Sequence, residues 1–220
     1  MPVSPGILLF VGAIALAILL LGPLYNLLFL DLLLVPLQGQ TQIAGILLDP
    51  TDVTFAVLIA GLLLRGRLTP GKMRRDVPFF WLWASLGALA SIAYLLAPLY
   101  QQHLTAFHRI IYQVYRAAWK PILYFPLAAL LLSNPVLVRK TLWVIVLAGD
   151  ICALIALPEG LQGLKAEGPF GTGNSLGAAL IAPFVISFGM VISTRAPRAK
   201  VGYGVSFLLL GRVLLYAGSR

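Results

Sequence analysis

The sequence predicts an all-α fold: a polytopic integral membrane helical bundle of about seven transmembrane helices, forming a single membrane domain over residues 1–220. Three observations predict it. Hydrophobic residues make up 60% of the chain. Charged residues make up only 10%, whereas a soluble domain carries about 25%. The apolar residues also form runs that approach the roughly 20 residues needed to cross a bilayer. This composition excludes a water-soluble globular domain and a disordered chain.

The first apolar run covers residues 7–37 and is interrupted by Gly22 and Pro23. At about 1.5 Å per residue it is too long for one ordinary crossing. We predict a span over residues 7–21, a break, and a shorter helix ending near residue 35. One crossing followed by a re-entrant or interfacial helix is preferred, and a true hairpin is the alternative. The later runs, which predict the remaining spans, cover residues 53–64, 77–97, 119–132, 141–157, 175–193 and 201–217.

The formal net charge of +9 predicts the orientation of the chain rather than a nucleic-acid partner. Ten Lys and Arg residues lie in three alternate loops, at residues 65–76, 133–140 and 194–200, and five lie in the other loops and at the chain end. Because membrane proteins concentrate cations in cytoplasmic loops, the first set is predicted to be cytoplasmic. The loop at 158–173 is then outside. The N-terminus is inside for one crossing and outside for a hairpin.

Three ionisable residues, Asp31, Asp150 and Arg212, fall inside apolar runs. An unpaired charge in the membrane costs several kcal/mol. Counted from their cytoplasmic ends, Asp150 and Arg212 lie at depths that agree within about 3 Å. We therefore predict an intramembrane Asp150–Arg212 pair. Such a pair is either a structural bridge or a charge that borders an aqueous cavity.

Two outer segments carry polar groups that suit an anion. The glycine-rich segment at residues 168–177 lacks the GK[ST] ending of a phosphate-binding P-loop. It is predicted to enter a helix with Asn174 or Ser175 as N-cap, and serves either as a plain turn or as an anion site at the helix N-terminus. Arg116 and Lys120 lie one helical turn apart, as a phosphate-binding pair or an ordinary snorkelling pair.

No metal or other cofactor is predicted. His103 and His108 are the only histidines, and no carboxylate lies near them in the sequence. The single Cys152 lies inside an apolar run and cannot form an internal disulfide.

Four segments together carry a resemblance to a known family. In chain order they are LDPTD at 48–52, YRAAWK at 115–120, GPFGTGN at 168–174 and GSR at 218–220. Their order resembles the bacterial O-antigen ligase and O-antigen polymerase family, in which a G-x-F-x-x-x-N loop precedes a span and a later span ends in Ser-Arg. The resemblance covers nearly the whole chain. Each motif is short, and their order is more specific than any one of them.

The resemblance implies a glycosyltransferase of the bacterial inner membrane. It would transfer a glycan from an undecaprenyl-diphosphate carrier to an acceptor at the outer face, without a metal. Arg220 matches the family arginine that engages the diphosphate, and Arg116, Lys120 and Asn174 complete the predicted site. Family members continue into a large periplasmic loop with a further arginine and a histidine. We therefore expect the chain to be the N-terminal part of a longer protein and inactive alone.

Two other functions are consistent with the same sequence. One is a transporter of a small anion or a lipid-linked sugar, with Asp31, Asp150 and Arg212 along its path. The other is a non-catalytic membrane scaffold. A transporter typically shows two similar halves and broken helices. The sequence has one broken stretch, at residues 22–23, and no second copy of it, which favours the enzyme.

Overall fold

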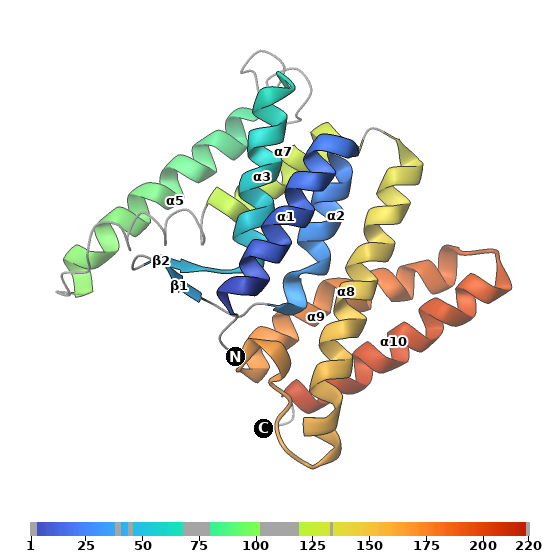
Figure 1. The fold of residues 1–220 in the computed structure, drawn as a ribbon. Coiled ribbons are helices and arrows are strands. Elements are labelled where there is room, and N and C mark those ends of the chain that lie inside the picture. Colours follow the sequence, from blue (N-terminus) through green and yellow to red (C-terminus); the bar gives the residue numbers. More distant parts are fainter. Residues whose placement is uncertain are drawn as a thin grey trace.

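The computed structural model describes residues 4–37, 41–43, 46–67, 80–101, 119–132 and 134–218. Its elements are α1 (Pro5–Leu21), α2 (Tyr25–Leu33), η1 (Val35–Leu37), β1 (Thr41–Ile43), β2 (Ile46–Leu48), α3 (Pro50–Leu64), α5 (Phe80–Gln101), α7 (Lys120–Leu131), α8 (Pro135–Leu161), η3 (Gly168–Phe170), α9 (Gly173–Ser193) and α10 (Pro197–Gly218) (Figure 1). The predicted helical architecture is confirmed. Within the described residues it is interrupted only by the short antiparallel β1–β2 hairpin.

Three of the described helices are long and apolar enough to cross a membrane by length and composition: α8, α9 and α10. Shorter apolar helical stretches occupy Pro5–Leu21, Pro50–Leu64, Trp81–Ala93 and Ile122–Leu131. Large apolar side chains such as Leu21, 89% exposed, lie on the outer surface of the bundle. Such a surface is suited to lipid rather than to water. These features support a membrane protein, and the count of about seven spans stays a prediction.

The N-terminal stretch folds back on itself. Pro23 has no backbone N–H, so the helical hydrogen-bond pattern ends there, and α2 returns alongside α1 (Figure 1). At one end, the Arg65 guanidinium at the end of α3 donates to the carbonyls of Leu19 and Gly22, at 2.9 and 3.2 Å. The structure therefore has the path of the hairpin alternative. The nine residues of α2 are only about 14 Å long, less than a bilayer.

Two hydrophobic cores hold the bundle together. The first joins α1, α2, α3 and α7 around buried leucines that include Leu27, Leu58 and Leu127. The second joins α8, α9 and α10. Its helices approach closely because small residues line the contact: a Cβ on Gly149 would lie 2.5 Å from the Cβ of Pro183. Small residues allow such close approach between membrane helices. Contacts of α2 with α8 connect the two cores.

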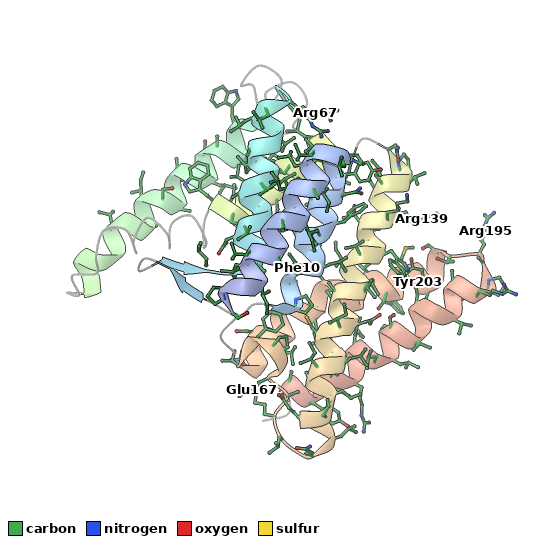
Figure 2. The ribbon with its side chains drawn as sticks, viewed as in Figure 1. Phe10, Arg67, Arg139, Glu167, Arg195 and Tyr203 are labelled. Atoms are coloured by element: carbon green, nitrogen blue, oxygen red, sulfur yellow. The ribbon has the colours of Figure 1, made fainter. Side chains whose placement is uncertain are left out.

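The two ends of the bundle differ in charge. Arg67 and Arg139 lie toward the upper end in Figure 2, where α3 ends and α8 begins, and Arg195 lies at the tip of the turn between α9 and α10. Glu167 lies at the lower end, between α8 and α9. The starts of α1, α3 and α9 and the end of α10 also lie toward the lower side (Figure 1). The described residues of LDPTD, GPFGTGN and GSR therefore lie on this side.

Candidate functional site

The candidate site begins with the way α3 starts. Asp49 is the N-cap, with an extended backbone, and Pro50 follows at the first helical position, where a proline is favoured. The Asp49 carboxylate accepts from the Asp52 N–H at 3.0 Å, and Asp52 Oδ2 accepts from the Asp49 N–H at 3.1 Å. This reciprocal capping box explains the local pattern LDPTD. It also fixes two carboxylates at the start of one helix.

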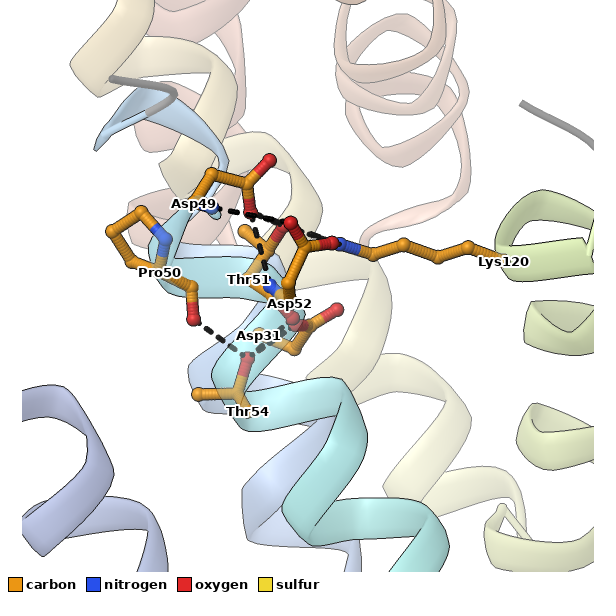
Figure 3. Close-up of polar contacts among 7 residues, drawn as sticks. All are labelled: Asp31, Asp49, Pro50, Thr51, Asp52, Thr54 and Lys120. Carbon is orange, nitrogen blue, oxygen red and sulfur yellow. Dashed lines mark hydrogen bonds and ion pairs between the residues drawn. The ribbon is translucent and has the colours of Figure 1, made fainter. Parts of the chain in front are cut away.

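Lys120 reaches these carboxylates from the first residue of α7 (Figure 3). Its Nζ donates to Asp52 Oδ1 at 2.7 Å and to Thr51 Oγ1 at 2.6 Å, and it lies 3.8 Å from Asp49 Oδ1. Lys120 is 7% exposed, and Asp52 4%. Asp49, Thr51, Asp52 and Lys120, which we call the ionic cluster, form a largely buried network. Removing either partner of a buried ion pair destabilises the protein, because the remaining charge is then uncompensated.

Asp31 adds a third carboxyl group beside this cluster, from α2. The Thr54 hydroxyl and Asp31 Oδ1 form a hydrogen bond, and both residues are fully buried. The other carboxyl oxygen, Oδ2, has no hydrogen-bond partner in the part of the chain that the structure describes. Figure 3 shows Asp31 next to Asp52, below the ammonium group of Lys120. The predicted intramembrane residue Asp31 therefore belongs to the junction between α2 and α3.

The position of Lys120 changes its predicted role. We expected it to contact a diphosphate, but its ammonium has three N–H donors and faces Thr51, Asp52 and Asp49. It is therefore a buried structural cation in this structure. The prediction missed this because it compared Lys120 only with Arg116 on the same segment, and pairing with α3 depends on the tertiary fold. Arg116 and Arg220 lie outside the described residues.

The ionic cluster joins two resemblance segments, LDPTD and the end of YRAAWK. Sequence reasoning quoted both but did not predict that they touch, and it assigned no site role to Asp49, Thr51, Asp52 or Thr54. A usable signal was present. Acidic residues are scarce in this chain, with seven Asp and Glu in all. Two of them three residues apart beside an apolar run require a cationic partner if they are buried.

The GPFGTGN segment forms η3 and the entry into α9. Thr172 is the N-cap and accepts from the Ser175 N–H at 3.2 Å, so the expectation that Asn174 or Ser175 caps this helix was wrong. Gly171, the residue before Thr172, has a positive φ and ends the 3-10 turn. The helix therefore starts earlier in the chain than predicted, at Gly173. Asn174 is exposed in the first turn of α9. The Glu159 carboxylate holds the loop by accepting two backbone N–H groups at 2.7 and 2.9 Å.

The predicted Asp150–Arg212 pair is not formed. The Ser206 hydroxyl donates to Asp150 Oδ2 at 2.6 Å, whereas Arg212 Nε donates to the Tyr216 hydroxyl at 2.7 Å. Ser206 and Arg212 are separated by about 9 Å along the helix. The prediction that Asp150 and Arg212 lie at equal depths holds only if their helices run side by side. Because α10 crosses α8 at an angle (Figure 1), Ser206 is the residue opposite Asp150. Arg212 is exposed and lies over the Tyr216 ring.

No family model, curated protein or solved structure matches this chain. Over the part of the chain that the structure describes, no group of three or more His, Cys, Asp or Glu side chains converges as a metal site requires. The chemistry of the described site is charge pairing and hydrogen bonding between helices.

Proposed function

We propose that the chain is the membrane part of an O-antigen ligase-like or O-antigen polymerase-like glycosyltransferase. It would bind a glycan linked to undecaprenyl diphosphate at the periplasmic face of a bacterial inner membrane. The observation that carries the proposal is the contact between two resemblance segments: Lys120 bonds to Asp52 at 2.7 Å. A third segment, GPFGTGN, begins α9 toward the same side of the bundle (Figure 1).

The proposed chemistry is attack by an acceptor hydroxyl on the anomeric carbon, with the diphosphate as leaving group. Arg116 and Arg220 would neutralise the charge that develops on the leaving diphosphate, because an arginine fork suits phosphate oxygens. Lys120 supports the site indirectly by fixing the start of α7, four residues after Arg116. Asn174 and the first N–H groups of α9 would face the same ligand.

The proposal includes an orientation and a span count. The cation-rich loop after α3 lies in the cytoplasm, and the starts of α3, α7 and α9 lie at the outer face. The predicted seven spans would correspond to α1, α3, α5, α7, α8, α9 and α10. Because α1 and α3 start toward the same side, the short α2 and the residues after it would return the chain to the outer face, and the N-terminus would lie outside, as in the hairpin alternative. The loop after α8, with Glu159 and Glu167, is then periplasmic.

The test is a lipid-binding measurement on this chain in lipid nanodiscs. Undecaprenyl diphosphate should bind more tightly than undecaprenyl monophosphate, and Arg116→Ala or Arg220→Ala should reduce that preference at least tenfold, the equivalent of about 1.4 kcal/mol. Arg212→Ala is the matched control, because Arg212 is an exposed arginine on α10 that already contacts Tyr216. Equal binding of the two lipids by the unaltered chain would contradict the proposal.

A transporter is the second candidate. The observation that favours it is the presence of Asp31 and Asp150 within apolar helices. Each has one carboxyl oxygen without a hydrogen-bond partner among the described residues. Ionisable residues inside a membrane often mark a transport path. Solute flux into proteoliposomes that contain the chain, lost in Asp150→Asn and unaffected by Arg116→Ala, would select this candidate over the enzyme.

A further inference from the structure

Asp31 differs from the other carboxyl groups around it in how few donors it receives. Asp49 accepts from the Thr51 hydroxyl and from the Asp52 N–H, and it also faces Lys120 at 3.8 Å. Asp52 accepts from the Asp49 N–H and from Lys120. Asp31 is fully buried, yet among the described residues only the Thr54 hydroxyl forms a hydrogen bond with it, and its Oδ2 has no hydrogen-bond partner there. An ionised carboxylate offers about four acceptor positions, so this environment is poor for a buried negative charge.

The hydrogen bonds of Thr54 point the same way. The Thr54 oxygen lies close to Asp31 Oδ1, 3.1 Å from the Thr51 carbonyl oxygen and 3.4 Å from the Pro50 carbonyl oxygen. A hydroxyl group carries one hydrogen and also accepts. If that hydrogen is donated to the Thr51 carbonyl, the contact with Asp31 requires a hydrogen on Asp31. In a neutral acid, Oδ2 is an uncharged carbonyl oxygen. Burying such an oxygen without a hydrogen bond costs less free energy than burying a charged carboxylate oxygen in the same way.

The surrounding charges do not compensate an ionised Asp31. Among the described residues, the charged groups that act on it are Lys120 from α7 and Asp49 and Asp52 from α3. Lys120 is bonded to Asp52 and Thr51. The two α3 carboxylates repel a further negative charge. The described parts of α1 and α8, which pack near α2 and α3, contribute no charged group to this set.

We propose that Asp31 is a proton-binding site. Near neutral pH its carboxyl group is a neutral acid that donates to the Thr54 hydroxyl, which donates in turn to the Thr51 carbonyl oxygen. The proton joins α2 to α3. Its loss leaves an unpaired negative charge in the junction, so the contact between the N-terminal hairpin and α3 weakens as the pH rises. This proposal stands independently of the glycosyltransferase assignment.

Infrared spectroscopy of the chain in lipid nanodiscs tests the proposal. Near neutral pH, the difference spectrum between the unaltered chain and Asp31→Asn should contain the carbonyl band of a carboxylic acid, and this band should disappear on alkaline titration. Asp49→Asn is the matched control. It removes a neighbouring carboxylate and should leave the acid band in place. A difference spectrum that contains a carboxylate band instead would overturn the assignment.

Two further measurements keep the proposal testable if Asp31→Asn folds poorly. In Thr54→Val the acid band should persist but move to higher frequency, because its hydrogen-bond acceptor is gone. An ionised Asp31 gives no acid band. The absence of this band from the spectrum of Thr54→Val would therefore contradict the proposal. Where Asp31→Asn does fold, the equilibrium constant of unfolding can be compared between the unaltered chain and this variant. The ratio of the two constants should rise about tenfold for each pH unit, up to the pH at which the acid band disappears. A constant ratio over that range would also contradict it.

Discussion

Lys120 and Asp52 join α7 to α3 through a 2.7 Å ion pair between residues 68 positions apart in the chain. Both side chains are buried, so water does not screen the pair strongly. The contact holds together two helices that start toward the same side of the bundle.

Removing one partner of this pair should destabilise the bundle more than removing both. Lys120→Met leaves the cluster carboxylates without their ammonium, and Asp52→Asn leaves the ammonium facing a weaker partner. Each single change should cost about 3–5 kcal/mol. The double variant should cost less than the sum, as measured by a denaturant titration of the chain in detergent micelles. Strictly additive costs would show that the two side chains do not interact.

Arg65 should stabilise the N-terminal hairpin. Its guanidinium donates to the carbonyls of Leu19 and Gly22, which close the end of α1. Arg65→Ala should lower the free energy of unfolding by about 1.5–3 kcal/mol, the value of hydrogen bonds to a charged group. Arg67→Ala removes an exposed neighbouring arginine and serves as control, with an expected change below about 0.5 kcal/mol. Equal effects of the two variants would exclude this role of Arg65.

Gly149 should not tolerate a side chain, whereas Gly177 should. A Cβ on Gly149 would lie 2.5 Å from the Pro183 Cβ, and a proline ring cannot rotate away. Gly149→Ala should therefore destabilise the α8–α9 packing by about 1–3 kcal/mol. Among the described residues, nothing beyond the adjacent backbone of α9 lies within 4 Å of a Cβ built on Gly177, so Gly177→Ala should be neutral or stabilising by up to about 1 kcal/mol. Thermal denaturation of both variants provides the comparison.

The proposed orientation predicts which loops are accessible from outside the cell. In a Cys152→Ala background, Gln162→Cys should react with a membrane-impermeant thiol reagent in intact cells. Arg67→Cys should react only after the cells are opened. Both positions are exposed, so burial does not explain a difference between them. Reaction of Arg67→Cys alone in intact cells would mean that the proposed orientation is inverted.

Several features of this protein follow from the sequence alone. Apolar composition and run length predicted a helical chain with membrane-length helices, because these properties depend on residues close together in the chain. The break at Gly22 and Pro23 was also predicted, since a glycine directly before a proline weakens a helix at two successive positions. The clustering of cations in alternate loops also predicted an orientation in the membrane, and this orientation stays a prediction.

Tertiary structure decided which polar side chains meet. Asp150 bonds to Ser206 rather than to Arg212, because the crossing of α8 and α10 sets which residues are opposite. Lys120 bonds to Asp52 for the same kind of reason. Distances along one helix follow from its rise per residue, so spacing predicts partners within an element. Partners on different helices depend on packing angle and register, which small residues such as Gly149 allow and which no local pattern encodes.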